Sequence, residues 1–161
     1  MKRTSIAALA AVLALSTPAL TGCFSGFGAT TSYQATMNSG NGVEAKVGRI
    51  DVENATLVLG PEGSNSATLL VRMINTGVED DALVYASING ANAYVTPGAE
   101  SLPRGASISF GADSDAWINT YALDVPVSSY VPVELAFQNA GLVKISVLTV
   151  PATGYYEGIA P

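Results

Sequence analysis

After residue 42, apolar side chains recur at every second position of the chain. This period of two is typical of half-buried β-strands, whereas an amphipathic helix has a period of 3.6. The alternation is clearest in four triplets: Leu69, Val71 and Met73; Ala106, Ile108 and Phe110; Val133, Leu135 and Phe137; and Val143, Ile145 and Val147. We therefore expect a strand in each of these four segments.

Turn signals separate the predicted strands. They are Gly60-Pro61-Glu62-Gly63, Asn75-Thr76-Gly77, Asn89-Gly90, Pro97-Gly98, Pro103-Arg104-Gly105 and Asn139-Ala140-Gly141. Glycine, proline and asparagine favour the backbone conformations that tight turns require. Short strands at this spacing, with no amphipathic helix among them, predict an all-β fold, an antiparallel sandwich or barrel.

The N-terminus has the order of a secretory signal: basic Lys2 and Arg3, an apolar run over residues 6–15, and a small-residue site before Cys23. The apolar run is shorter than the roughly 20 residues that a membrane span needs. The tetrad ending at Cys23, Leu-Thr-Gly-Cys, resembles the lipobox of bacterial lipoproteins, which implies acylation of the Cys23 sulfur and cleavage before it. We therefore expect a lipoprotein anchored to the outer face of the cell membrane.

Composition divides the chain into four predicted segments. Residues 1–22 are the lipoprotein signal peptide, and residues 23–42, rich in Gly, Ser, Thr and Asn, form a flexible tether. Residues 43–150 form one β-sandwich domain, and residues 151–161 form a C-terminal tail. Cys23 is the only cysteine, so its acylation would leave no thiol for a disulfide and stability would depend on the core.

Charge and the absence of histidine narrow the possible functions. Without Lys2 and Arg3, five basic residues remain against thirteen acidic ones, a formal net charge of −8. Nucleic acids and anionic lipid headgroups are poor partners for such a chain, because binding them requires Lys and Arg. The chain has no histidine, the commonest general base and metal ligand, and no nucleophile-elbow or phosphate-loop motif. We therefore expect a protein that is not an enzyme and that binds no cofactor.

Two acidic clusters are the candidates for a cation site or for catalysis by carboxylates. Glu79-Asp80-Asp81 precedes a predicted strand, where such charges are usually solvated, and Asp113 and Asp115 share a loop. A hard cation would need several converging oxygens from more than one segment. An enzyme acting through carboxylates alone would need two of them in one pocket. We expect neither, and predict no metal site and no catalytic residue.

A few aromatic residues are candidates for contact with a partner protein. Trp117, Asn119 and Tyr121 would share one strand face, although a lone tryptophan is usually packed in a core or rim. The tail offers Tyr155, Tyr156 and Ile159. We expect the tail to be frayed, as chain termini usually are, but keep these three residues and Trp117 as possible partner contacts.

Two segments resemble the periplasmic PCu(A)C copper chaperones. Residues 66–84 resemble their strand with an N-x-G turn, an acidic pair and Leu-Val, and residues 131–147 look like their closing hairpin. The likeness spans roughly residues 43–150 and includes Leu102-Pro103-x-Gly105. With a lipobox and a tether, the chain is most similar to the LpqE-like lipoproteins of actinobacteria. The resemblance implies a Greek-key β-sandwich of cupredoxin-like or immunoglobulin-like type.

The chain departs from this family at the copper ligands. The family binds Cu(I) with His and Met, but this chain has Thr96-Pro97-Gly98 near the first His and Trp117-Ile118-Asn119 near the later His-x-Met. Beyond the predicted signal, the only methionines are Met37 on the tether and Met73 in a predicted core strand. Soft copper prefers imidazole and thioether ligands, so we expect the family's copper site to be absent.

These observations favour a non-catalytic binding or scaffold module with an extracytoplasmic membrane-protein partner. PCu(A)C and LpqE-like proteins are associated with the cytochrome oxidase branch of respiration. The resemblance therefore implies an accessory or assembly subunit of an actinobacterial cytochrome bcc–aa3 complex. The alternative is a copper chaperone for cytochrome oxidase that uses ligands other than those of the family.

Overall fold

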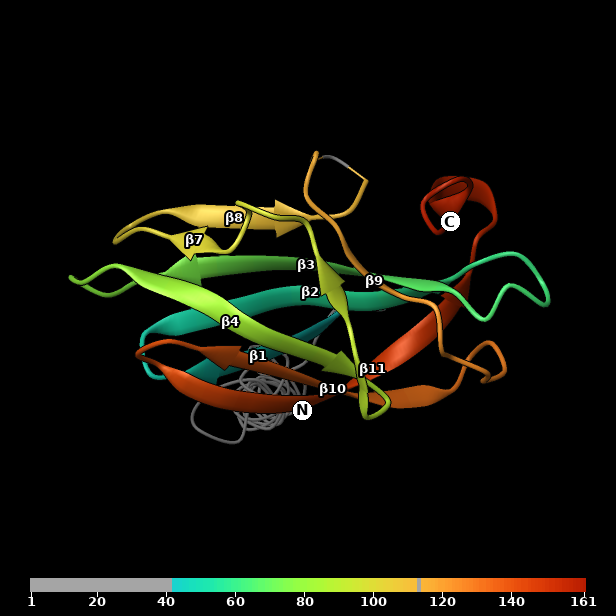
Figure 1. Cartoon of the computed structure of the whole chain (residues 1–161), viewed down its shortest axis with the longest axis horizontal. Helices are drawn as coiled ribbons and strands as arrows, with labels where there is room; N and C mark the ends of the chain where they lie inside the picture. Colours follow the sequence, from blue (N-terminus) through green and yellow to red (C-terminus); the bar gives the residue numbers. More distant parts are fainter. Residues whose placement is uncertain (1–41, 113) are drawn as a thin grey trace, which may run out of the picture. The chain divides into compact units, whose positions relative to one another are not determined.

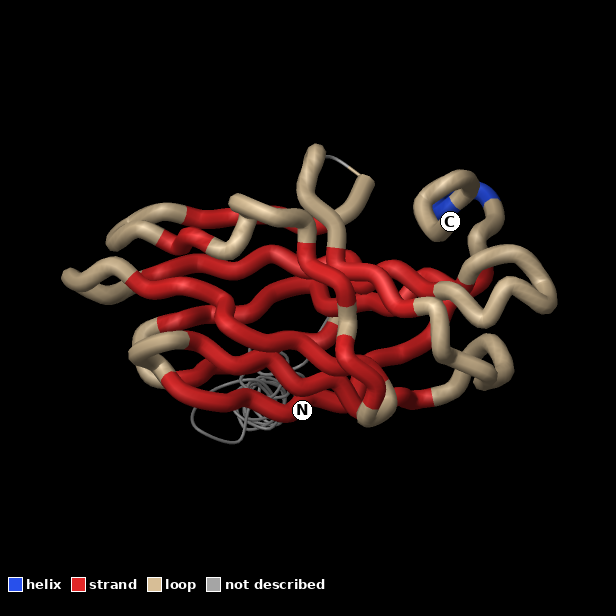
Figure 2. Tube along the Cα trace, viewed as in Figure 1, coloured by secondary structure: helices blue, strands red, loops and turns tan. Residues whose placement is uncertain are grey.

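A computed structural model describes residues 42–112 and 114–161, and Figures 1 and 2 show strands throughout this part of the chain. The predicted signal, Cys23, Met37, Asp113 and all of the tether except Gly42 lie outside the described residues. The strands are β1 (Val43–Val47), β2 (Ile50–Leu59), β3 (Ala67–Asn75), β4 (Asp81–Ile88), β5 (Ala91–Asn92), β6 (Tyr94–Val95), β7 (Ser101–Leu102), β8 (Ser107–Phe110), β9 (Ile118–Thr120), β10 (Tyr130–Phe137) and β11 (Gly141–Pro151).

The described residues contain no α-helix. Their one helical segment is a 3₁₀ turn, η1 (Gly154–Tyr156), after the last strand. No helix in this part of the chain is both long and apolar enough to cross a membrane.

The strands form two layers that face each other across one core. In one layer β2 pairs with β1 and β3, and β3 extends it through β8, β9 and β6. In the other layer β10 pairs with β4 and β11, and β4 extends it through β5 and β7. β11 then crosses to the first layer, where Thr149–Pro151 pair with Leu57–Leu59 of β2 and nearly close the sheet. The predicted all-β sandwich is confirmed.

The β2–β11 pair is parallel, whereas every other pair of described strands is antiparallel. The prediction of a purely antiparallel sandwich is therefore incomplete at this seam. β11 reaches β2 because it bends from one layer into the other after pairing with β10 as a hairpin. The pair is parallel because both strands run from the hairpins at residues 48–49 and 139–140 toward the opposite end. A strand that changes layers in this way closes the corner of a sandwich.

The core consists of the inward side chains of both layers, and the four predicted triplets supply much of it. Within them, Met73, Phe110, Leu135 and Val147 are buried, while the intervening residues face outward. The fully buried side chains include Ile50, Leu57, Leu69, Met73, Ile88, Leu102, Ile118, Leu135, Val131 and Val133. Burial of a large aliphatic side chain contributes about 1.5–3 kcal/mol, so this core can hold the domain without disulfides.

Many of the loops lie at the two ends of the sandwich (Figure 1). At one end, called here the hairpin end, lie the turns at residues 48–49, 75–81, 103–105 and 139–140. At the other, called the tail end, lie the loops at residues 60–66 and 121–129 and the tail, residues 152–161. Because β3 runs from residue 67 to residue 75, it joins the two ends.

Candidate functional site

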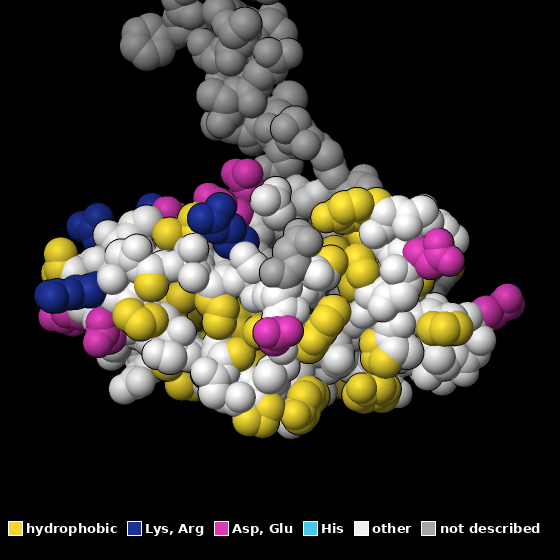
Figure 3. Space-filling view, turned by 90° about the horizontal axis from the view of Figure 1, so that it is seen from above, with side chains coloured by type: hydrophobic (Ala, Val, Ile, Leu, Met, Phe, Trp, Pro, Cys, Tyr) yellow, Lys and Arg dark blue, Asp and Glu magenta, His cyan; other side chains and the backbone are white. Residues whose placement is uncertain are grey.

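Basic residues are confined to the half of the domain that carries the hairpin end. The five that follow the predicted signal are Lys46, Arg49, Arg72, Arg104 and Lys144, and none lies in the loops or tail of the tail end. In Figure 3 the Lys and Arg side chains, in dark blue, lie in the left half of the view. The charged side chains visible in the right half are acidic. The two ends of the sandwich therefore offer different surfaces to a partner.

The hairpin end is built around the buried side chain of Asn75. Asn75 Nδ2 donates to the carbonyl oxygens of Glu79 (2.8 Å) and Leu102 (3.0 Å), and Asn75 Oδ1 accepts from the Gly77 amide at 2.9 Å. A Cβ at Gly77 would lie 2.9 Å from Asn75 Oδ1 and 3.1 Å from Arg49 Cβ, so the position favours glycine. The N-x-G motif is thus a structural element of this end.

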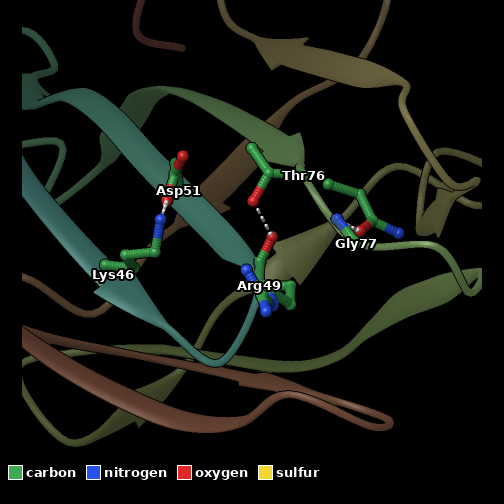
Figure 4. Close-up of polar contacts among 6 residues, drawn as sticks. Lys46, Arg49, Asp51, Thr76 and Gly77 are labelled. Atoms are coloured by element: carbon green, nitrogen blue, oxygen red, sulfur yellow. Dashed lines mark hydrogen bonds and ion pairs between the residues drawn. The ribbon is translucent and has the colours of Figure 1, made fainter.

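Neighbouring contacts at the hairpin end are visible in Figure 4. Thr76 donates through both its amide and its Oγ1 to the Arg49 carbonyl at 2.8 Å, which joins the β1–β2 turn to the end of β3. Lys46 Nζ pairs with Asp51 Oδ1 at 2.7 Å across the same hairpin. Both side chains of that pair are solvated, so it adds little to stability.

The acidic cluster at residues 79–81 has a structural role that the sequence did not reveal. Asp81 accepts the amides of Ala82 and Asn139 on Oδ1 and that of Ala140 on Oδ2, at 2.8–2.9 Å. Asp80 Oδ1 accepts the Arg104 amide at 2.9 Å. Asp80 is exposed, as expected of a solvated charge, and Asp81 is half-buried. The sequence did not reveal that both side chains also hold neighbouring turns in place through backbone amides.

A small hollow of about 230 Å³ at the hairpin end is lined in part by residues 79–81, whose side chains carry three carboxylates. Two of them are already engaged with backbone amides, which leaves Glu79 without a hydrogen bond from its side chain to a described residue. No group of three or more His, Cys, Asp or Glu side chains within residues 42–112 and 114–161 is placed to hold a metal ion. Asp115 is exposed.

The tail is ordered against the outer face of the sheet, so the expectation of a frayed terminus is wrong. Ile159 and Ala160 are buried against Val58 and Val150, with Trp117 and Tyr156 packed around them. Ser66 Oγ donates to the Pro161 carbonyl. Thr68 Oγ1, whose one proton is donated to Asn119 Oδ1 at 2.8 Å, lies 3.4 Å from the Ile159 carbonyl. The apolar contacts and the Ser66 hydrogen bond fix the tail.

The candidate partner contacts therefore divide into two groups. Ile159, at 8% exposure, belongs to the chain's own packing, and Trp117 and Tyr156 are half-buried beside it. Tyr155 is 75% exposed and remains a predicted partner contact. Trp117 and Asn119 face outward from β9, where Asn119 Oδ1 accepts from Thr68 Oγ1 at 2.8 Å.

A larger hollow of about 670 Å³ lies at the tail end, between residues 59–66, 123–127 and 151–153. Its wall combines apolar side chains, such as Pro61, Val125 and Val127, with the carboxylates of Glu62 and Asp124. Sequence reasoning missed these residues, because no motif links the three segments. The one available signal was the lack of any Lys or Arg in them.

The segments that replace the family's copper ligands lie next to each other in the structure. Thr96 follows β6 and Trp117 precedes β9, and the two strands pair. The Trp117 amide donates to Thr96 Oγ1 at 2.8 Å, and the Thr96 amide donates to the Trp117 carbonyl at 2.9 Å. The resemblance thus aligned two segments that do meet in space.

Chemically, the Thr96–Trp117 junction does not suit Cu(I). The Thr96 hydroxyl already bonds to backbone, and neither residue offers an imidazole or a thioether. Met73, the only methionine within the described residues, is 0% exposed on the inward face of β3. The donor groups at this junction do not fit the family's copper site.

The solved structures that resemble the described domain include three of PCuAC domains, two of PmoF2 and one of PmoF1. The copper-bound PCuAC domain from PmoF2 has a TM-score of 0.60 and 22% identity, over 68% of this chain and 98% of that one. The apo PCuAC domain from PmoF1 has a TM-score of 0.60 and 23% identity, over 68% and 99%. The apo PmoF2 PCuAC domain has a TM-score of 0.58 and 21% identity, over 70% and 98%.

No protein-family model matches the chain, and no curated protein sequence matches it. At 21–23% sequence identity, the structural likeness establishes a shared fold. The described domain therefore has the PCuAC fold, as the sequence resemblance predicted.

Proposed function

We propose that this chain is a membrane-anchored extracytoplasmic lipoprotein whose PCuAC-type domain acts as a non-catalytic binding or scaffold module. The observation that carries the proposal is the Thr96–Trp117 junction. At the place where the resemblance puts copper ligands, the two residues hydrogen-bond to each other. A PCuAC fold without that donor set keeps a rigid sandwich with loops at both ends, which suits docking on another protein.

The anchoring half of the proposal rests on the N-terminal sequence. Its test is the intact mass of the chain purified from membranes. We expect loss of residues 1–22 and a mass increase that corresponds to acylation at Cys23. Cys23→Ser should lack this modification and leave the membrane fraction. An unmodified mature chain would contradict the anchor.

The partner proposed here is the cytochrome bcc–aa3 complex of actinobacteria, and the support for it is the LpqE-like resemblance. The test is to tag the chain after Pro161, which is exposed, and to purify it from native membranes in mild detergent. A haem difference spectrum and the co-purifying proteins are then recorded. Stoichiometric cytochromes would support the proposal, and clean isolation without haem proteins would end it.

Copper delivery by other ligands is the second candidate, since one of the similar domains is described as copper-bound. Here copper would be the cargo of the chain. The chain purified from membranes would be tested for Cu(I) retention against a chelator, with Met37→Leu and Met73→Leu as variants. Retention lost in either variant would favour delivery, and no retention by the unaltered chain would end this candidate.

The non-catalytic part of the proposal rests on side-chain chemistry. The chain has no histidine, and Asp80 and Asp81 already bind backbone amides. General acid–base catalysis by the remaining carboxylates would need two of them free at one reacting group. Glu62 and Asp124, which both line the tail-end hollow, are the pair that this alternative would have to use. Activity lost in Glu62→Gln or Asp124→Asn, against any substrate, would contradict the non-catalytic part of the proposal.

A further inference from the structure

The tail end contains carboxylates without internal partners. Glu62 and Asp124 line its hollow and form no ion pair or hydrogen bond with another described residue through their side chains. The two ion pairs of the described chain both lie in the other half, at Lys46–Asp51 and Lys144–Glu134. Because no basic residue lies in the tail-end loops or the tail, while Glu62, Asp124 and Glu157 do, the formal charge of these segments is negative.

Apolar side chains are exposed beside these charges. Val127, which lines the hollow, is 51% exposed. Tyr121 and Tyr130, which bracket the loop that contains it, are 63% and 69% exposed. Tyrosine is enriched in protein interfaces because its ring packs while its hydroxyl stays hydrated. The combination of a hollow, apolar walls and unpaired charges of one sign is what a docking surface provides.

We propose that the tail-end hollow docks a cationic, apolar segment of the partner protein, in which Arg or Lys alternates with aliphatic residues. The inference rests on the proposed function, because it assigns the surface through which the scaffold module contacts its partner. The basic groups would pair with Glu62 and Asp124, and the aliphatic groups would cover Pro61, Val125 and Val127. Charge complementarity of this kind speeds association and fixes the orientation of docking.

The test is binding of a fluorescein-labelled peptide, Gly-Leu-Arg-Leu-Gly-Arg-Leu-Gly, to the full-length chain in non-ionic detergent, followed by anisotropy. Matched peptides carry Gln or Glu in place of Arg. We expect the Arg peptide to bind about tenfold more tightly than the Gln peptide, and salt to reduce this preference by screening.

Two double variants locate the binding site. Glu62→Gln with Asp124→Asn should lower affinity for the Arg peptide about tenfold. Glu53→Gln with Glu79→Gln removes the same charge from the other half of the domain and should leave affinity within about twofold. None of these four side chains takes part in an ion pair of the described chain, so all the variants should fold. Circular dichroism checks this.

Equal binding of the Arg and Gln peptides, or unchanged binding by the tail-end double variant, would overturn the proposal. So would self-association of the chain that the same variant abolishes, because the occupant would then be a second copy. If haem proteins co-purify equally with the tail-end variant, the docking surface is wrong while the proposed function stands. If the peptide binds as expected but no haem proteins co-purify, the cytochrome partner is wrong while the docking surface stands.

Discussion

The two ends of the sandwich use their polar side chains differently. At the hairpin end an amide and two carboxylates, from Asn75, Asp80 and Asp81, hold neighbouring turns by bonding to backbone groups. At the tail end the comparable bonds come from neutral hydroxyls, as when Thr149 Oγ1 donates to the Pro126 carbonyl at 3.0 Å. The side chains of Glu62 and Asp124 at the tail end form no such bond with another residue of the described part of the chain.

This difference separates structural acidity from acidity that is available to a partner. A carboxylate that accepts several amide hydrogen bonds is needed by the fold, and its position says little about a ligand. A carboxylate beside an apolar hollow, without an internal partner, contributes little to stability. Substitutions at the two ends should therefore have opposite consequences: loss of stability at one, loss of binding at the other.

Asn75→Ala should have the largest effect on stability. It removes three hydrogen bonds and leaves buried groups such as the Leu102 carbonyl unpaired, which should lower the free energy of unfolding by about 4 kcal/mol. Urea unfolding followed by circular dichroism measures it. Asn139→Ala removes one exposed hydrogen bond, to the Asp80 carbonyl, and should cost less than about 1 kcal/mol. Equal effects would mean that Asn75 does not organise this end.

Ile159→Ala should come next, because the tail is fixed largely by apolar packing. Truncating a buried isoleucine typically costs about 3 kcal/mol, and it should also loosen the contacts around Trp117. Since Trp117 is the only tryptophan, its fluorescence reports this site, and its emission should shift to longer wavelength. Tyr155→Ala, at an exposed position, loses only the edge-on contact of its ring with Tyr156, so stability should fall by about 1 kcal/mol at most and the Trp117 emission should stay unchanged. An unchanged spectrum in Ile159→Ala would mean that the tail is not docked in solution.

Asp81→Ala should lower the free energy of unfolding by about 2 kcal/mol, because it leaves the Asn139 and Ala140 amides without their acceptor. Hydrogen exchange at residues 139–140 should rise in the same variant. Glu79→Ala is the matched control, since its side chain bonds to no described residue, and should change stability by less than about 0.5 kcal/mol. Similar losses in the two variants would remove the distinction between them.

Local patterns in the sequence predicted the strands but not all of their partners. Alternation identified segments such as residues 69–73 and 133–137 because each strand buries one face. It carries no information on which strands pair, so the parallel contact of Leu57 with Thr149 was missed. The docked tail was missed because Ile159 and Ala160 lie outside any periodic pattern.

The candidate sites were harder to predict because their parts are distant in sequence. Asp81 meets Asn139 across 58 residues, and neither residue type signals the contact. That Thr96 and Trp117 lie close together could be predicted only from the family resemblance, which placed their two segments near the family's copper ligands. The tail-end hollow combines three loops that share no motif, so it required the three-dimensional structure.

The variant with the smallest expected effect on stability gives the most direct test of the difference between the two ends. Glu62→Gln with Asp124→Asn removes two charges that form no ion pair or hydrogen bond with another described residue, so the free energy of unfolding should change by less than about 0.5 kcal/mol. Urea unfolding of this double variant, beside Asp81→Ala, compares acidic residues from the two ends directly. A loss near 2 kcal/mol in the double variant would show that Glu62 and Asp124 are structural after all. Unchanged stability with weakened peptide binding would instead assign them to the partner.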